Sequence, residues 1–145
     1  MKNYSDPRMH TAEHILNQTM VRLFDRGRSF SAHVEKKKSK CDYHFDRDLT
    51  PEEISTIEKM VNDTISQNLS VTESFIPRAD AEEKFNLGRL PEHAGDAIRI
   101  ISVGDYDQCP CSGAHVQSTS EIPGFKIIST GFENGVLRIR FKLNE

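Results

Sequence analysis

Helical and strand-like segments follow one another in this sequence without the strict alternation that builds a parallel sheet. Strand patterns over residues 30–34 and 40–45 lie between two helical patterns, and strands over 125–130 and 136–143 follow each other directly. The remaining predicted elements are a strand over 71–76, a short helix over 79–85 and a strand over 97–103. Consecutive strands joined by short turns pair antiparallel. The sequence therefore predicts the α+β class, with an antiparallel sheet and helices packed on one face.

Both long helices have clear start signals. Asp6 followed by Pro7 predicts a helix that runs towards Gly27, since the carboxylate accepts hydrogen bonds from free amides and proline suits the first helical position. Thr50 and Glu53 form a capping box at the start of the second helix, whose apolar stripe includes Ile57. Asn134-Gly135 predicts the tight turn between the last two strands.

The chain has 145 residues, which is a common size for one domain, and we expect residues 1–145 to form one. Lys and Arg number 19 against 22 Asp and Glu, so the formal net charge is −3. A slightly acidic chain is not a general nucleic-acid binder, and contact with RNA requires a local basic patch.

The three cysteines are Cys41, Cys109 and Cys111. An odd number of cysteines without an export signal argues against a disulfide framework and favours reduced thiols in the cytoplasm. No apolar run approaches the roughly 20 residues of a membrane-spanning helix. We therefore expect a cytoplasmic protein without a membrane partner.

Potential metal ligands occur in two pairs with the same spacing. His10 and His14 are four residues apart in the first helix, where side chains at this spacing share a face. Cys111 and His115 have the same spacing on a predicted loop, and this shared relation favours Cys111 over Cys109. Three imidazoles and one thiolate suit zinc better than magnesium or calcium, so the pattern predicts a Zn²⁺ site.

The segment His10-x-x-Glu13-His14 also fits the H-x-x-E-H pattern of inverzincin metalloproteases, in which the glutamate is the general base. The short chain argues against that interpretation, and so does a Cys and a His in place of a downstream acidic ligand. Lone HxxxH and CxxxH motifs are weak signals, and their conjunction is what favours a metal site.

The two motifs, together with Phe45-Asp46 and the segment Asp96-Ala97-Ile98-Arg99-Ile100, resemble the editing domain of alanyl-tRNA synthetases. The similarity covers nearly the whole chain and is strongest to the free-standing editing proteins of the short AlaX type, and threonyl-tRNA synthetases carry a related domain. Ser112 and Ala114 depart from the usual Cys-Gly-Gly-Thr-His loop but leave both ligands in place.

The resemblance implies a hydrolase that acts in trans on mischarged tRNA(Ala), chiefly seryl-tRNA(Ala) and also glycyl-tRNA(Ala), at a zinc-containing pocket. The zinc ligands that it implies are His10, His14, Cys111 and His115. The partner would be the acceptor end of the tRNA, and no ATP is expected because no aminoacylation domain is present. The alternative is a zinc-stabilised module that binds tRNA or a protein without chemistry.

Candidate contacts to the substrate are Ser31, Gln117 and Thr119. Ser31 matches the neighbourhood in which the family places a hydroxyl, and the other two follow the last ligand. We assign no general base, since four protein ligands are typical of closed structural zinc sites, whereas catalytic zinc usually keeps one position open.

Lysines concentrate in one segment, at positions 36, 37, 38 and 40, with Arg22, Arg26 and Arg28 nearby in sequence. Such a run is either a solvated turn or a contact to the tRNA backbone. A backbone contact would make deacylation strongly salt-dependent.

Overall fold

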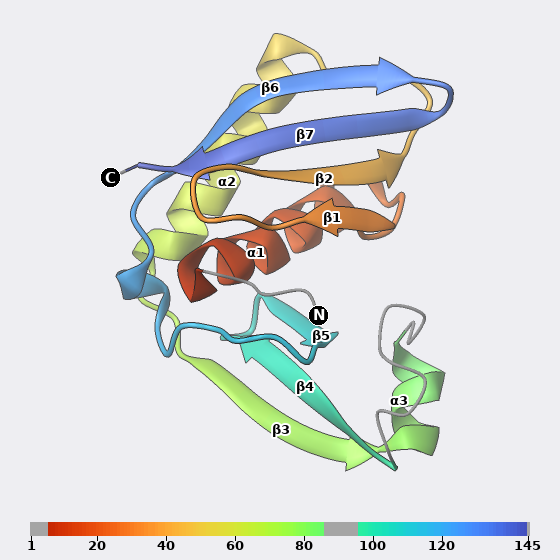
Figure 1. Ribbon diagram of the computed structural model, residues 1–145, viewed down its shortest axis with the longest axis vertical. Coiled ribbons are helices and arrows are strands. Elements are labelled where there is room, and N and C mark those ends of the chain that lie inside the picture. Colours follow the sequence, from red (N-terminus) through yellow and green to blue (C-terminus); the bar gives the residue numbers. More distant parts are fainter. Residues whose placement is uncertain (1–5, 86–95, 145) are drawn as a thin grey trace.

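The strands form two antiparallel sheets in the computed structural model, which describes residues 6–85 and 96–144 (Figure 1). The four-stranded sheet has the order β1 (Ser31–His33), β2 (Ser39–His44), β7 (Val136–Leu143) and β6 (Phe125–Glu133). The three-stranded sheet has the order β3 (Val71–Pro77), β4 (Ala97–Val103) and β5 (Asp107–Pro110).

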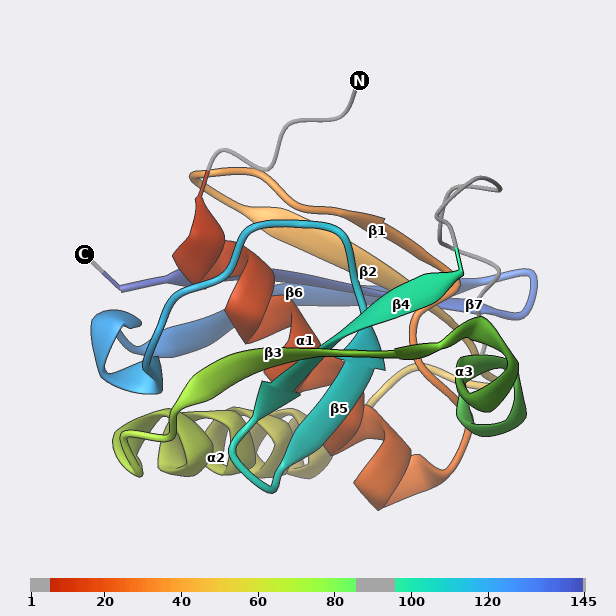
Figure 2. The ribbon, with the colours of Figure 1, turned by 90° about the horizontal axis from the view of Figure 1, so that it is seen from below.

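Two long helices cover one face of the four-stranded sheet. They are α1 (Pro7–Phe24) and α2 (Pro51–Ser66), which pack against each other. The three-stranded sheet lies on the other side of α1, so that this helix is sandwiched between the two sheets (Figures 1 and 2). The short helix α3 (Arg78–Lys84) connects β3 towards β4, and a single 3₁₀ turn, η1 (Thr119–Glu121), precedes β6.

The core lies between the helices and the inner face of the four-stranded sheet. Alternate residues of β2 and β7 point inward, among them Cys41, Tyr43, Leu137 and Ile139, which are at most 1% exposed. The intervening residues point to the outer face, as the period of two in a strand requires. A second, smaller cluster under α3 contains Ala81, Ile98 and Ile100.

The predicted helix starts are confirmed. The Asp6 side chain accepts a hydrogen bond from the Arg8 amide at 2.9 Å, and Thr50 and Glu53 make both bonds of the capping box. Asn134 and Gly135 take positive φ angles of 52° and 80°, which is what a two-residue hairpin turn needs.

The α+β class and the antiparallel pairing are therefore as predicted, but the strands divide between two sheets. The sequence analysis did not identify β5, because its four residues include a proline and show no clear alternation. None of the helices in the described ranges is both long and apolar enough to cross a lipid bilayer.

Candidate metal centre

The N-terminal half of α1 supplies two histidines from one face. His10 and His14 are each 3% exposed, although they belong to a residue type that is usually solvated. Their ring centroids are 5.1 Å apart, as expected for side chains one helical turn apart. Because the three-stranded sheet covers this face of α1, the two rings point into the interior of the molecule.

The other two side chains come from the loop that follows β5, and Arg99 of β4 holds this loop in place. The Arg99 guanidinium donates from Nη1 to the carbonyl oxygens of Cys111 at 3.1 Å and Gly113 at 2.7 Å. The Cys111 amide in turn donates to the Arg99 carbonyl at 3.2 Å. The position of the thiol is thus fixed by strand pairing and by a charged side chain.

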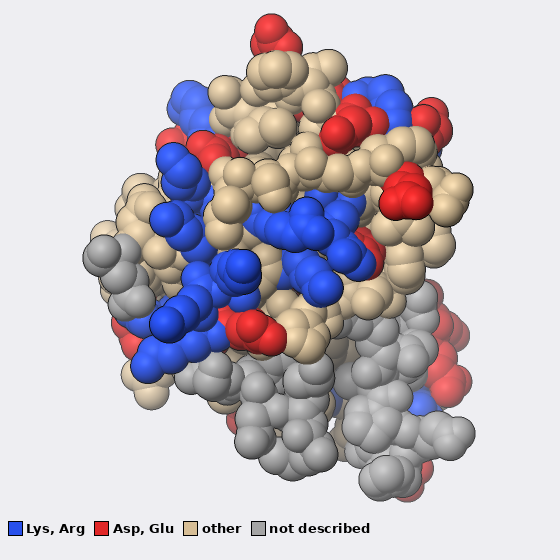
Figure 3. All heavy atoms as spheres, turned by 45° about the horizontal axis from the view of Figure 1, so that its top comes forward, with Lys and Arg blue, Asp and Glu red and all other residues tan. Residues whose placement is uncertain are grey.

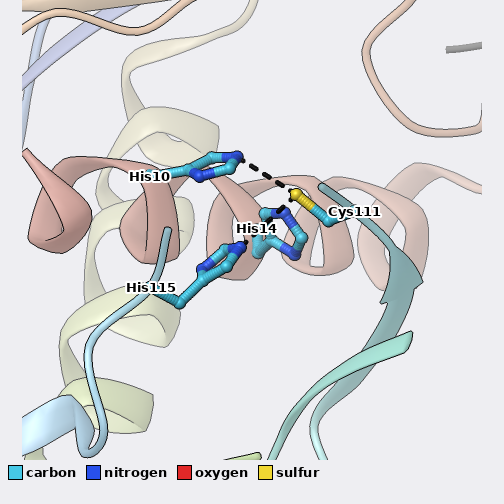
Figure 4. Close-up of side chains that lie close together, drawn as sticks. All are labelled: His10, His14, Cys111 and His115. Atoms are coloured by element: carbon cyan, nitrogen blue, oxygen red, sulfur yellow. Dashed lines mark hydrogen bonds between the residues drawn. The ribbon is translucent and has the colours of Figure 1, made fainter. Parts of the chain in front are cut away.

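These four side chains converge although the two segments are about a hundred residues apart in sequence (Figure 4). One donor atom from each of His10, His14, Cys111 and His115 lies within 4.8 Å of all the others. Cys111 Sγ is 3.4 Å from His10 Nε2 and 3.5 Å from His115 Nε2. The ligands of a tetrahedral zinc ion lie roughly 3.3–3.8 Å apart, so small side-chain rotations close this set on one ion.

Groups around the cluster orient the imidazoles. His10 Nδ1 lies 3.1 Å from the Ala114 carbonyl oxygen, to which it can only donate, so Nε2 is the ring nitrogen that faces the Cys111 sulfur. His115 Nδ1 lies 2.9 Å from the Thr11 hydroxyl. Outer partners of this kind are typical of metal-binding histidines.

His14 lacks such a hydrogen bond, and Asp107 is the group that faces it. His14 Nδ1 has no hydrogen-bond partner among the described residues and lies 3.6 Å from Asp107 Oδ2. The Asp107 carboxylate is buried and accepts hydrogen bonds from Arg28 at 2.6 Å and Gln18 at 2.9 Å. A buried imidazole beside a carboxylate is stabilised when a positive charge lies on it or next to it.

The charge states of the cluster follow from these contacts. Burial opposes ionisation of the Cys111 thiol, but hydrogen bonds from the three histidines outweigh it and lower its pKa to about 3. Burial disfavours protonated His14, but the Asp107 carboxylate and the Cys111 thiolate beside it outweigh burial and raise its pKa to about 9. The pKa of His115 falls to about 4, because burial and the neighbouring His14 charge outweigh its bond to Cys111. The cluster thus contains a thiolate at Cys111 beside a protonated imidazole at His14.

This donor set fits a zinc ion. Three nitrogens and one thiolate sulfur match the ligands and the number of ligands of zinc sites in proteins. A divalent cation would replace the proton that the cluster holds on His14, and the orphaned Nδ1 of this residue would then carry a proton that faces Asp107. The predicted convergence of the four residues is confirmed, and their role as ligands remains a proposal.

Cys109, the other thiol in this stretch, lies outside the cluster. Burial raises the pKa of its thiol to about 12, and Sγ donates to the Pro110 carbonyl at 3.4 Å. The preference for Cys111, made from the spacing to His115, therefore agrees with the structure.

Among the candidate substrate contacts, the structure brings only Gln117 beside the cluster. Gln117 is exposed and lines, with His115, a pocket of about 280 Å³ against β3 and β4. Further lining residues are Thr72, Glu73, Arg99 and Ile101. One of the four clustered side chains, His115, thus forms part of the wall of this pocket.

Ser31 and Thr119 lie elsewhere. Ser31 pairs with Asp42 and is exposed, while its neighbour Ala32 packs on the core, so its hydroxyl is on the outer face of the four-stranded sheet, away from α1. Thr119 is fully buried, and its hydroxyl donates to the Ile65 carbonyl and accepts from the Leu69 amide, both at 2.9 Å. This hydroxyl joins η1 to the end of α2, so it is not available to a substrate.

The sequence analysis missed a buried polar chain beside the centre. Glu13 Oε1 lies 3.8 Å from His10 Nε2, and Glu13 Oε2 accepts from Asn17 at 2.6 Å. Asn17 Oδ1 accepts from the Tyr43 hydroxyl at 2.8 Å and from the Ser29 amide at 3.0 Å. The available signal was the spacing of His10, Glu13 and Asn17, which puts three polar side chains on one helix face.

Comparison with known proteins shows what the chain is similar to. Residues 98–140 match the family described as the threonyl and alanyl tRNA synthetase second additional domain. An alanine–tRNA ligase of Coxiella burnetii (strain Dugway 5J108-111) is 34% identical over 134 residues, which cover 91% of this chain and 16% of the ligase. The corresponding ligase of Bacillus pumilus is 36% identical over 132 residues, which cover 90% of this chain and 15% of the ligase.

A third relative covers slightly more of this chain. The alanine–tRNA ligase of Aeropyrum pernix is 34% identical over 147 residues, which cover 97% of this chain and 16% of the ligase. The chain thus spans about one sixth of the length of the curated relatives that it matches. As its paired motifs predicted, the chain contains sequence of the threonyl and alanyl tRNA synthetase second additional domain family, matched over residues 98–140.

Proposed function

We propose that this protein is an aminoacyl-tRNA deacylase that hydrolyses mischarged tRNA(Ala), with seryl-tRNA(Ala) as its main substrate and glycyl-tRNA(Ala) as a second. The observation that carries the proposal is the convergence of His10, His14, Cys111 and His115 beside an open pocket. Kinship with part of the alanine–tRNA ligases supports tRNA(Ala) as the carrier. We place the protein in the cytoplasm, where aminoacyl-tRNA is used and the Cys111 thiol stays reduced.

The four clustered residues would hold zinc. When bound, zinc supplies a Lewis acid for the ester carbonyl or for a water molecule. The residues around the cluster hold the ligand side chains in position for this chemistry. Arg99 fixes the loop that carries Cys111, and Thr11 and the Ala114 carbonyl orient two of the imidazoles.

Gln117 is the residue that we propose for selection of the amino acid. Its exposed amide lies two residues beyond His115, on the wall of the pocket. An amide can hydrogen-bond to the hydroxyl of an esterified serine, and a site built around that bond binds alanine less well because its polar group is left unpaired. The ester of correctly charged tRNA would then survive.

One observation favours a second candidate, a zinc-stabilised module that binds tRNA without chemistry. All four donors come from the protein, and such closed sets are typical of structural zinc sites. The two functions differ in what happens to the ester bond, which can be measured directly.

The deciding experiment is to incubate the zinc-loaded protein with seryl-, glycyl- and alanyl-tRNA(Ala) and to follow the remaining esters. We expect the seryl ester to disappear selectively. Cys111→Ser should abolish this activity, and Cys109→Ser is the matched control, two residues away, that should keep it. If all three esters persist while the tRNA binds, the protein is the binding module. Gln117→Ala should reduce the preference for seryl over alanyl ester by about 2- to 10-fold, the value of one neutral hydrogen bond.

A further inference from the structure

Basic side chains gather on the outer face of the four-stranded sheet, opposite α1 and α2. Because Cys41, Leu137, Ile139 and Phe141 point inward, the alternating positions of β2 and β7 point outward. Seven basic residues occupy this face or the turn beside it and make no ion pair with the described residues, and we call them the outer basic face. Its members are Lys36, Lys37, Lys38, Lys40, Lys126, Arg140 and Lys142.

The strand register places like charges directly opposite each other. Lys40 is the cross-strand partner of Arg140, and Lys126 is the partner of Lys142. Like charges in directly opposed positions destabilise a sheet. The arrangement therefore costs stability, which indicates that it serves something other than the fold.

The members of this face have no ion pairs among the described residues, whereas most other arginines that the structure describes are paired with a carboxylate. Arg138, on the same face, is paired with Asp42 through two hydrogen bonds of 2.7 and 2.8 Å. The arginines that lie near the lysines in sequence also have partners. Arg28 binds Asp107, Arg22 donates to the Tyr106 carbonyl, and Arg26 pairs with Asp46.

Charge is thus segregated in a chain whose formal net charge is −3. Figure 3 shows Lys and Arg side chains gathered in the middle of the outer face and along one side of it. A hollow of about 320 Å³ lies within this region, lined by His33, Glu35, Lys38, Ser39, Lys40 and Arg140. The one carboxylate among them, Glu35, is already paired with His33.

The position of the lysine turn connects this face to the metal centre. The turn between β1 and β2, which carries Lys36, Lys37 and Lys38, lies next to the first turns of α1 in both ribbon views (Figures 1 and 2). The same part of α1 carries His10 and His14. A polyanion that lies on the outer face and passes this turn therefore approaches the end of the helix at which the cluster is built.

We propose that the outer basic face binds the phosphodiester backbone of tRNA, next to the acceptor end that the metal centre would receive. The identity of the RNA rests on the proposed function, whereas the affinity for phosphodiesters rests on the face itself. Lysine and arginine contacts of this kind position a nucleic acid and do not read its bases. The face accordingly supplies affinity and orientation, and selection of the amino acid stays with the pocket beside His115.

The test uses uncharged tRNA(Ala), so that no hydrolysis is needed. Binding is measured by fluorescence anisotropy between about 0.05 and 0.5 M salt for the wild type and for the double variant Lys40→Gln, Arg140→Gln. Two lost phosphate contacts should weaken binding roughly 25- to 60-fold at 0.1 M salt and reduce the salt slope by about 1.4–1.8. The control is Lys59→Gln, Lys84→Gln, which changes the net charge equally on α2 and α3 and should bind like the wild type.

The thermal midpoint of the double variant is measured alongside, and it should be unchanged or higher because a cross-strand repulsion is removed. Equal affinity and slope for the double variant and the wild type would overturn the proposal. Binding to vesicles of anionic lipid that depends on Lys40 and Arg140, without binding to tRNA, would overturn it in favour of a membrane surface. Loss of deacylase activity on its own bears only on the proposed function, since this assay does not involve the ester.

Discussion

The helices α1 and α2 share a capped, proline-led start and pack on the same sheet, but they differ in what they bury. The buried residues of α2 are mostly aliphatic: Ile57, Val61, Thr64 and Ile65. The buried polar residues of α1 are His10, Thr11, Glu13, His14, Asn17 and Thr19. A buried polar group costs free energy unless it is paired, so a helix chosen only for stability would resemble α2.

This difference indicates that α2 supports the fold, whereas α1 also builds the candidate metal centre. Most of the polar groups of α1 have partners in the ligand loop, in β2 or in the Asp107 region. The helix thus organises the interior around the candidate metal centre. Substitutions in α1 should therefore alter metal binding, and substitutions in α2 should alter stability alone.

The largest effect is expected for His14→Ala. Removal of one of four donors should reduce the zinc content from about one ion per chain to almost none and lower seryl-tRNA(Ala) hydrolysis to background. The wild type should gain about 2.7 kcal/mol of stability from free zinc at a hundred times its dissociation constant, and the variant should gain none. Metal analysis and zinc-dependent thermal unfolding measure both, and full zinc content in the variant would contradict the assignment.

Ile57→Ala tests the other helix. This side chain is fully buried, and its truncation should lower the free energy of unfolding by about 2–5 kcal/mol. The folded variant should still bind zinc with the affinity of the wild type. Urea unfolding and a competition titration with a chelator check the two parts, and a loss of zinc affinity as large as that of His14→Ala would remove the distinction between the helices.

Two buried threonines offer a matched pair. Thr11 contacts His115 Nδ1, whereas the Thr64 hydroxyl donates to the Met60 carbonyl within α2. Thr11→Val should weaken zinc binding by about 10- to 100-fold, as the loss of an outer partner does. Thr64→Val should leave zinc binding unchanged, so equal zinc affinities in the two variants would show that Thr11 does not orient His115.

The smallest effect concerns the cap of α2. Hydrogen bonds from Arg47 and the Thr50 amide lower the pKa of Glu53 to about 2, from an ordinary value of 4.5. Because the folded-state pKa is the lower one, the stabilisation is complete above about pH 5 and is lost as the pH falls towards 2. In Glu53→Gln, the urea midpoint should change less between pH 5 and pH 3 than it does in the wild type. In Glu52→Gln, it should change as much as in the wild type.

Local signals in the sequence were enough to predict the two helices, the terminal hairpin and the four clustered side chains. Capping residues, the Asn134-Gly135 turn and the repeated spacing of four each act over a few residues, so a single sequence reveals them. The conjunction of the two pairs predicted that they share one ion, and the family resemblance implied the same four ligands.

Features that depend on tertiary contacts could not be predicted in this way. The division into two sheets is set by pairings between distant strands, and the face on which Ser31 lies follows from the register with β2. The contacts of Arg99, Asp107 and Thr119 also join distant segments. The extent of the basic face could not be predicted for the same reason. Arg140 lies opposite Lys40 across a strand pair, whereas Arg28, which is closer to the lysines in sequence, binds Asp107.

The central claim is that His10, His14, Cys111 and His115 bind one zinc ion together. X-ray absorption at the zinc edge of the purified, zinc-loaded protein tests this claim most directly. The structure predicts one sulfur neighbour at about 2.3 Å and three nitrogen neighbours at about 2.0–2.1 Å, with the sulfur signal lost in Cys111→Ser and kept in Cys109→Ser. A zinc environment without sulfur, or one that Cys111→Ser leaves unchanged, would contradict it.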